Sequence, residues 1–178
     1  GIAIAEQYGG AGFGPQELAI ACEEMGRSLY SGPFFASAVC AAHALSETGS
    51  EAQKQQWLPG IASGEIIACL AITEHAPMWS DEDIRTTATS NADGKYQLSG
   101  TKHYVIDAQV AEVIFVAARE IDGSIALFAT DTGAHGLTIT PVQSMGCAIT
   151  IQACLYERAL RIPQDLLAAH ERCSSLTC

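Results

Sequence analysis

The first third of the chain carries apolar residues at helical spacing. Two stripes recur every three or four positions, and their members are Leu18, Cys22, Met25 and Leu29, then Phe35, Val39, Ala42 and Leu45. Gly14-Pro15 places a proline at a first helical position, where its missing N–H costs nothing. Gly49 is suited to stop the second helix, and Ser50 and Gln53 form a capping box for a third, which Pro59 is expected to end.

From about residue 65 the pattern changes to that of short strands. Apolar or alternating segments occupy residues 66–72, 84–90, 96–98, 102–106, 113–118, 125–129, 137–140 and 150–156. Asp93-Gly94 is a hairpin signal, and Ser99-Gly100 indicates a second turn. The run from Val113 to Ala118 is continuously apolar, as in a strand buried on both faces. The regular spacing favours a small antiparallel sandwich or barrel.

The order of the elements defines the fold class as α+β, because helices and strands are segregated rather than alternating. We predict a helical domain over residues 1–64 and an antiparallel β-barrel or sandwich domain over residues 65–163. Residues 164–178 return to helical texture, and we interpret them as the start of a truncated C-terminal helical segment. The first residue is not methionine, so the sequence is consistent with a start inside a longer protein.

The composition argues against several classes of partner. The net charge is −11, from 9 basic and 20 acidic residues. Nucleic acid binding needs clustered Lys and Arg to neutralise phosphates, and anionic membrane surfaces need the same charges. No apolar run approaches the roughly 18 residues of a membrane span, and the N-terminus has no signal-peptide pattern. We therefore expect neither a nucleic acid nor a membrane partner.

The seven cysteines and five histidines show no spacing typical of metal or nucleophile sites. Four cysteines lie in apolar runs, where a free thiol behaves as a small hydrophobe, so we expect a reducing, cytoplasmic compartment. No metal site is predicted. No histidine has a Ser or Cys partner at a recognisable spacing, which leaves a hydrolase triad without support. The glycines between Gly9 and Gly14 lack the G-x-G-x-x-G spacing, so a turn is the favoured interpretation.

An ordered set of motifs resembles the acyl-CoA dehydrogenase family. Its members are Glu6-Gln-Tyr-Gly-Gly-Ala-Gly12, Glu23-Glu-Met-Gly-Arg27, Trp57-Leu-Pro59, Ala71-Ile-Thr-Glu74, Ser99-Gly-Thr-Lys102 and Leu160-Arg-Ile-Pro163. Each motif alone is weakly specific, but together they cover nearly all 178 residues in the family's order. The resemblance implies the family's N-terminal helical and middle β domains, without its C-terminal helical domain.

The resemblance also implies a chemistry. The family removes two hydrogens between Cα and Cβ of an acyl-CoA thioester and transfers hydride to FAD, while a carboxylate takes the α proton. Electron-transfer flavoprotein or a similar acceptor and a homo- or hetero-oligomeric assembly are the implied partners. Five positions correspond to the wall that faces the flavin: Leu70, Ile72, Thr73, Tyr104 and Ile106.

Several positions depart from the family pattern. Ser80 corresponds to a serine that meets the substrate's pantetheine side, but the preceding segment is longer and bulkier than usual. Trp79 stands where glycine leaves space for substrate, so we assign both residues to the substrate side. Ile106 replaces a hydroxyl residue and retains only its backbone N–H as a donor. No acid matches the family's catalytic base, which lies in its C-terminal domain, and Glu74 belongs to the Thr-Glu signature instead.

Three hypotheses follow. The leading one is a fragment of an acyl-CoA dehydrogenase-like flavoprotein without its base. The second is a non-catalytic, flavin-poor partner subunit or scaffold, which Ile106 and Trp79 motivate. The third is a related flavin oxidase or monooxygenase, because a fold does not fix the chemistry.

Overall fold

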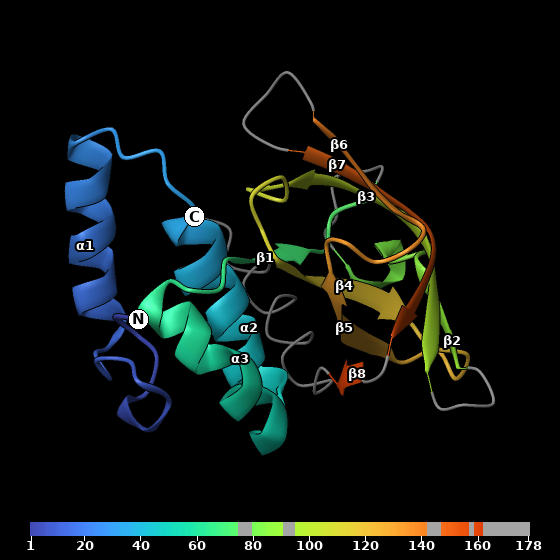
Figure 1. Ribbon diagram of the computed structural model, residues 1–178, viewed down its shortest axis with the longest axis horizontal. Helices are drawn as coiled ribbons and strands as arrows, with labels where there is room; N and C mark the ends of the chain where they lie inside the picture. The colour runs from blue at the N-terminus through green and yellow to red at the C-terminus, as the bar shows by residue number, and fades with distance from the viewer. Residues whose placement is uncertain (75–79, 91–94, 142–146, 157–158, 162–178) are drawn as a thin grey trace.

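The computed structural model describes residues 1–74, 80–90, 95–141, 147–156 and 159–161, with side chains up to residue 141. Helices come first and strands follow, so the predicted α+β class is confirmed (Figure 1). The segment predicted as C-terminal helix, 164–178, lies outside the described residues.

The helical layer has a short 3-10 turn, a π-helical segment and three α-helices. They are η1 (Glu6–Tyr8), α1 (Pro15–Arg27), η2 (Phe35–Ala41), α2 (Ala42–Thr48) and α3 (Glu51–Ser63). Helices α2 and α3 lie between α1 and the sheet, while α1 stands at the edge of the molecule and buries none of its side chains (Figure 1). The predicted capping box of α3 is present, because the Ser50 N–H donates to Gln53 Oε1 at 2.8 Å and the Gln53 N–H donates to Ser50 Oγ at 3.3 Å.

One predicted feature of the helices is wrong, and another is correct in position but differs in geometry. Pro59 lies inside α3 and does not end it, because Leu58 and Ile61 on either side are buried and their packing outweighs one lost backbone hydrogen bond. The helix ends instead at Gly64, whose φ of 82° is the left-handed conformation that glycine favours. Gly49 follows the end of α2, but its φ of −74° is ordinary, so it does not act through left-handed geometry.

Within the described residues, eight strands form one curled sheet with the order β6-β7-β3-β2-β4-β5-β8, and β1 pairs with β4. Their bounds are β1 (Ala68–Ala71), β2 (Thr87–Ser90), β3 (Tyr96–Val105), β4 (Val113–Arg119), β5 (Ile125–Asp131), β6 (Leu137–Pro141), β7 (Cys147–Tyr156) and β8 (Ala159–Arg161). Most pairings are antiparallel, as predicted. The pairings of β4 with β1 and β2 are parallel, which a reading based on hairpins did not anticipate.

Strand β3 is continuous where the sequence predicted a turn at Ser99-Gly100. Gly100 serves close packing instead, because a Cβ there would lie 2.8 Å from Cα of Thr86, a distance that no ordinary contact reaches. The residues of the Asp93-Gly94 hairpin lie outside the described part. The pairing they were expected to produce is present, with Ser90 opposite Tyr96.

Strand β4 separates two hydrophobic cores and is buried on both faces, as its apolar run predicted. Ile114 and Val116 face the inside of the curled sheet, where they join Leu98 and Phe128. Phe115 and Ala117 face the helical layer. This alternation follows from the two-residue period of a strand.

The C-terminal end of α1 yields a stability prediction. Leu29 has a φ of 53° and is 88% exposed, and the Tyr30 N–H donates to Met25 O at 2.9 Å, which is a Schellman-type end. Leu29→Gly removes the left-handed strain without losing burial, so we expect a gain of about 1 kcal/mol in the free energy of unfolding. Urea unfolding would measure this gain.

The matched control is Ile20→Gly, at a 63% exposed position inside the same helix. It should lower stability by about 1 kcal/mol, because glycine is unfavourable within a helix. Two glycine substitutions that change stability in the same direction would contradict the assignment.

Candidate functional site

All five positions that the sequence assigned to a flavin wall lie around one pocket of about 170 Å³, here called the β1–β3 pocket. Residues of η2, the end of β1 and the end of β3 line it: Ala36, Cys40, Leu70, Ile72, Thr73, His103, Tyr104, Val105 and Ile106. Sequence reasoning missed Ala36 and Cys40, because they come from a helical segment about thirty residues upstream whose contact with β1 has no local signal. It also missed His103. Binding of FAD by these residues stays a prediction.

A bulge at the end of β3 shapes this pocket. The register with β7 passes from Lys102 opposite Ile149 to Val105 opposite Cys147, so β3 contains one extra residue. Tyr104 takes a φ of 56°, which is uncommon for a bulky side chain. The His103 N–H donates to Thr73 O at 2.8 Å, which ties the bulge to the chain after β1. Consecutive side chains of β3 therefore reach one pocket instead of alternating between faces.

Large side chains at the rim of the pocket are exposed. Tyr104 is 64% exposed, Ile106 42% and Ile72 39%. Exposed apolar residues gathered in one place are typical of a binding surface. The pocket of about 170 Å³ is smaller than the roughly 300–1,000 Å³ of most small-molecule sites, so these residues alone do not enclose a ligand of ordinary size.

A buried ion pair holds the wall in place. Lys102 Nζ lies 2.7 Å from Glu74 Oε1, and the two side chains are 0% and 11% exposed. The ammonium also donates to Ile72 O at 2.9 Å. Burial of a cation is costly unless it is paired and hydrogen-bonded, and both conditions are met here.

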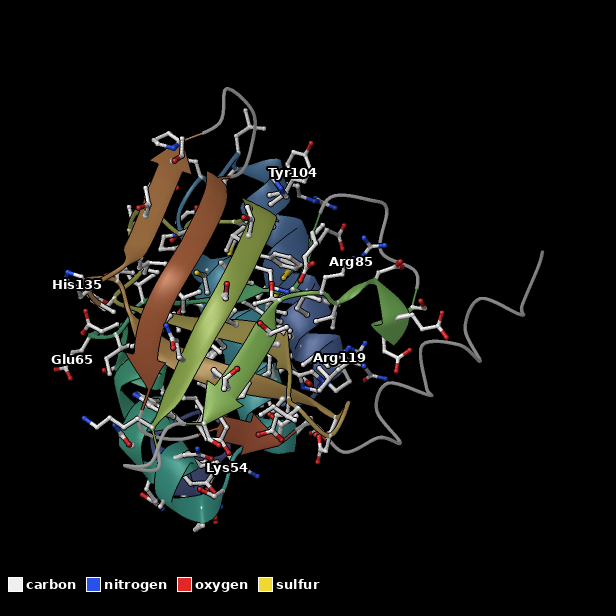
Figure 2. All side chains as sticks on the ribbon, turned by 90° about the vertical axis from the view of Figure 1, so that its right-hand side faces the viewer. Lys54, Glu65, Arg85, Tyr104, Arg119 and His135 are labelled. Carbon is white, nitrogen blue, oxygen red and sulfur yellow. The ribbon has the colours of Figure 1, made fainter. Side chains whose placement is uncertain are left out.

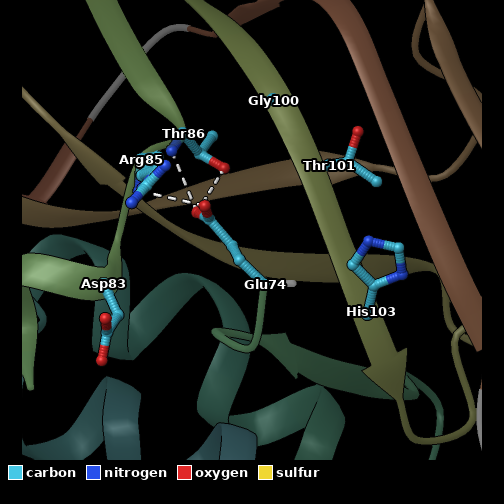
Figure 3. A pocket seen from close by; sticks show the side chains of 7 residues that line it. All are labelled: Glu74, Asp83, Arg85, Thr86, Gly100, Thr101 and His103. Carbon is cyan, nitrogen blue, oxygen red and sulfur yellow. Dashed lines mark hydrogen bonds between the residues drawn. The ribbon is translucent and has the colours of Figure 1, made fainter. Parts of the chain in front are cut away.

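The other contacts of the Glu74 carboxylate reach the start of β2. It accepts from the backbone N–H of Arg85 at 3.0 Å, from the N–H of Thr86 at 2.9 Å and from the Thr86 hydroxyl at 2.7 Å (Figure 3). Glu74 therefore binds three segments of chain together. This arrangement assigns the Thr-Glu and Gly-Thr-Lys signatures a structural role beside the pocket.

The pKa values of the pair reflect these contacts. Burial pushes the pKa of Glu74 upward, but hydrogen bonds from Lys102 and Thr86 outweigh it and hold the pKa below its ordinary value of 4.5. Burial lowers the pKa of Lys102 below 10.5, and Glu74 offsets only part of this effect. The carboxylate of Glu74 is therefore held in its ionised form by its partners, and it is unsuited to act as a general base.

A second cavity, of about 520 Å³, lies beside the first and is here called the β2–β3 cavity. Its lining is Glu74, Asp83, Arg85, Thr86, Gly100, Thr101 and His103 (Figure 3). His103 lines both cavities, so they adjoin at this residue. Sequence reasoning missed this cavity, because it assigned Gly100 to a turn and so placed the flanking residues on separate strands.

The turn η3 (Asp81–Asp83) borders the β2–β3 cavity and carries the substrate-side candidate Ser80 at its start. The Ser80 N–H donates to Asp83 Oδ2 at 3.3 Å. Arg119 holds this turn through the carbonyls of Asp81 and Ile84, at 2.6 and 3.2 Å. Ser80 is absent from the lining of either cavity. The other substrate-side candidate, Trp79, lies outside the described residues.

No group of three or more His, Cys, Asp or Glu side chains within the described residues is arranged to hold a metal ion. Nor does any helix in this part of the chain have the length and apolar character to cross a membrane.

A helical layer on a curled sheet, with exposed apolar residues around a pocket that Thr73 also lines, agrees with the helical and β domains that the sequence motifs implied. Two family models match: the acyl-CoA dehydrogenase N-terminal domain over residues 1–65 and the middle domain over residues 69–156. The chain belongs to the acyl-CoA dehydrogenase family.

Individual relatives agree with this assignment. Probable acyl-CoA dehydrogenase YngJ of Bacillus subtilis is 33% identical over 171 residues, which are 92% of this chain and 45% of the relative. A glutaryl-CoA dehydrogenase from Mycobacterium smegmatis in complex with FADH2 superposes with a TM-score of 0.78 and 25% identity, over 88% of this chain and 43% of that one.

One solved relative is a complex. The ChsE4-ChsE5 complex from Mycobacterium tuberculosis has a TM-score of 0.80 and 26% identity, over 97% of this chain and 47% of the relative. The chain thus spans about half the length of the relatives it matches.

The ion pair yields a prediction about stability. Lys102→Met leaves a nearly buried carboxylate without its cation, so we expect a loss of about 3–5 kcal/mol in the free energy of unfolding. Combining it with Glu74→Gln should recover part of this loss, because the unpaired charge is then gone. Urea unfolding of both single variants and the double variant measures the coupling, and additive losses would contradict it.

The lowered pKa of Glu74 yields a prediction about pH. A carboxyl whose folded pKa lies below its unfolded value contributes stability above the unfolded value, here 4.5, and loses it as the pH falls through the folded pKa. The stability difference between the wild type and Glu74→Gln should therefore narrow below pH 4.5. Urea midpoints at pH 7 and in steps below 4.5 test this, and a constant difference would contradict it.

Proposed function

We propose that this chain forms the flavin-facing part of an enzyme that dehydrogenates an acyl-CoA thioester between Cα and Cβ. The observation that carries the proposal is the convergence of Leu70, Ile72, Thr73, Tyr104 and Ile106 on one pocket. Family membership supports it. The activity belongs to a protein about twice as long, so this chain supplies a wall of the site and not the whole of it.

The residues of the wall fit a flavin. Leu70, Ile72 and Ile106 offer apolar surface to a flat ring, and Thr73 offers a hydroxyl to its polar edge. Tyr104 offers an exposed aromatic side chain beside them. The chemistry that FAD supplies when bound is acceptance of a hydride. The work of these residues is to orient the ring and exclude water from one of its faces.

The described residues offer no carboxylate as proton acceptor at the β1–β3 pocket. No carboxylate lies among the described residues that line the β1–β3 pocket, and Glu74 is engaged with Lys102 and Thr86. We therefore place the base outside the described residues of this chain. Electron-transfer flavoprotein or a similar acceptor would take the electrons, and a cytoplasmic location accords with the free thiols of Cys22, Cys40 and Cys69.

A second candidate function is that of a non-catalytic partner subunit. Ile106 favours it, because an apolar side chain stands at the pocket where the family pattern has a hydroxyl. The similarity to a ChsE4-ChsE5 complex makes a two-component assembly a reasonable setting for such a subunit.

Flavin binding by the full-length protein separates the two candidates. The first predicts visible flavin absorbance in the purified protein and tight rebinding of FAD after its removal. Tyr104→Ala and Thr73→Val should each weaken binding about tenfold, through lost ring contact and a lost hydrogen bond. Tyr30→Ala is the matched control, because Tyr30 is 55% exposed and lines neither cavity.

A colourless protein that ignores added FAD would reject the first candidate. The second candidate then predicts that Ile106→Thr, by restoring the hydroxyl, increases FAD binding. Tight binding of FAD by the unmodified protein would reject the second candidate.

A further inference from the structure

We propose that His103 stabilises the reduced form of the bound flavin and so raises its reduction potential. The proposal rests on the proposed function, because it assigns a role to one more residue of the wall that the flavin would contact. His103 lines the β1–β3 pocket together with the five wall residues, and it also lines the β2–β3 cavity. The sequence motifs gave this position no role.

Among the described residues that line the β1–β3 pocket, His103 is the only one whose side chain can carry a positive charge. The other polar groups of this lining are the hydroxyl of Thr73, the phenol of Tyr104 and the thiol of Cys40. An imidazole donates from one ring nitrogen when it is neutral and from both when it is protonated. His103 therefore brings the one N–H donor side chain of this lining to the pocket.

Backbone contacts hold His103 at the polar end of the wall. Its N–H donates to Thr73 O at 2.8 Å, so it is the neighbour of the residue that offers a hydroxyl to the ring's polar edge. The bulge of β3 brings His103 and Tyr104 to the same pocket, with their ring centroids 6.2 Å apart and their planes tilted by 48°. The position of the imidazole is therefore set by the fold of the wall.

The charged groups around His103 do not line the β1–β3 pocket. Lys102 precedes it in β3, but its ammonium is buried and lies 2.7 Å from the carboxylate of Glu74. Asp83 and Arg85 line the β2–β3 cavity with His103 and Glu74 (Figure 3). None of these four side chains belongs to the lining of the β1–β3 pocket. Within the described lining, His103 is thus the residue through which positive charge can reach the flavin.

The proposed reaction creates a charge that such a donor stabilises. The hydride from Cβ of the substrate brings one proton and two electrons to the ring, while the α proton goes to the base. The ring therefore gains one negative charge. A donor that is already in place where charge develops stabilises the charged form more than the neutral form. His103 should accordingly favour reduced flavin over oxidised flavin.

The test compares His103→Leu and His103→Gln with His135→Leu in the full-length protein. His103→Leu removes the donor, whereas His103→Gln keeps an uncharged N–H donor. His135 is exposed and lines neither cavity, and Figure 2 shows it well separated from Tyr104. Two quantities would be measured at a fixed pH: the dissociation constant of oxidised FAD and the midpoint potential of the bound flavin.

We expect His103→Leu to lower the midpoint potential by about 30 mV. For a two-electron couple this shift is a tenfold loss in the preference for reduced over oxidised flavin. His103→Gln should lose less, because its amide still donates, and the dissociation constant of oxidised FAD should change far less than that of the reduced form. A role in packing alone would weaken both redox forms equally and leave the potential unchanged.

The proposal is overturned if both His103 variants keep the wild-type potential, or if His135→Leu lowers it as much. The protein then still binds FAD, and the proposed function stands. A full-length protein that binds no FAD overturns the proposed function, and the role of His103 with it. His103→Gln supplies the comparison if His103→Leu does not fold.

Discussion

The buried pair of Lys102 and Glu74 is the constraint on which the rest of the site depends. It joins the chain after β1, the start of β2 and the middle of β3, which are far apart in sequence. Desolvation of two charges is tolerable only because hydrogen bonds satisfy both groups. The pair is weak evidence for high stability, but it fixes how three segments meet. Both cavities are bounded by those segments, so their shapes follow from this contact.

Local signals in the sequence predicted the helices, most of the strands and the β4 strand buried on both faces, because side-chain periodicity reports burial directly. They did not predict β8 (Ala159–Arg161), and they divided β3 into two segments. They failed where tertiary packing decided the outcome. Gly100 looked like a turn residue but serves close approach to Thr86, and Pro59 looked like a helix end but lies between buried neighbours. A single glycine or proline has several structural uses, and only the packed neighbours determine which applies.

Some residues of the candidate site were likewise predicted from the sequence, and others were not. Thr73 and Tyr104 were placed from motifs, and they do lie at one pocket. Motifs did not indicate Arg85 and His103. These residues line a cavity that forms only when separate strands and a bulge with one extra residue come together. The bulge changes the facing of every side chain after it, and no sequence period reports its position.

The placement of β4 between two cores has a consequence for how the chain can be divided. Trp57 of α3 packs edge-on against Phe115 with ring centroids 5.6 Å apart, and Leu45 and Leu58 join the same cluster as Leu127 of β5. The helices therefore have no core that is independent of the sheet. A truncation after α3 would follow the boundary between helices and strands in the sequence. It would nevertheless expose a hydrophobic surface on both fragments, so the helices and the sheet form one cooperative unit.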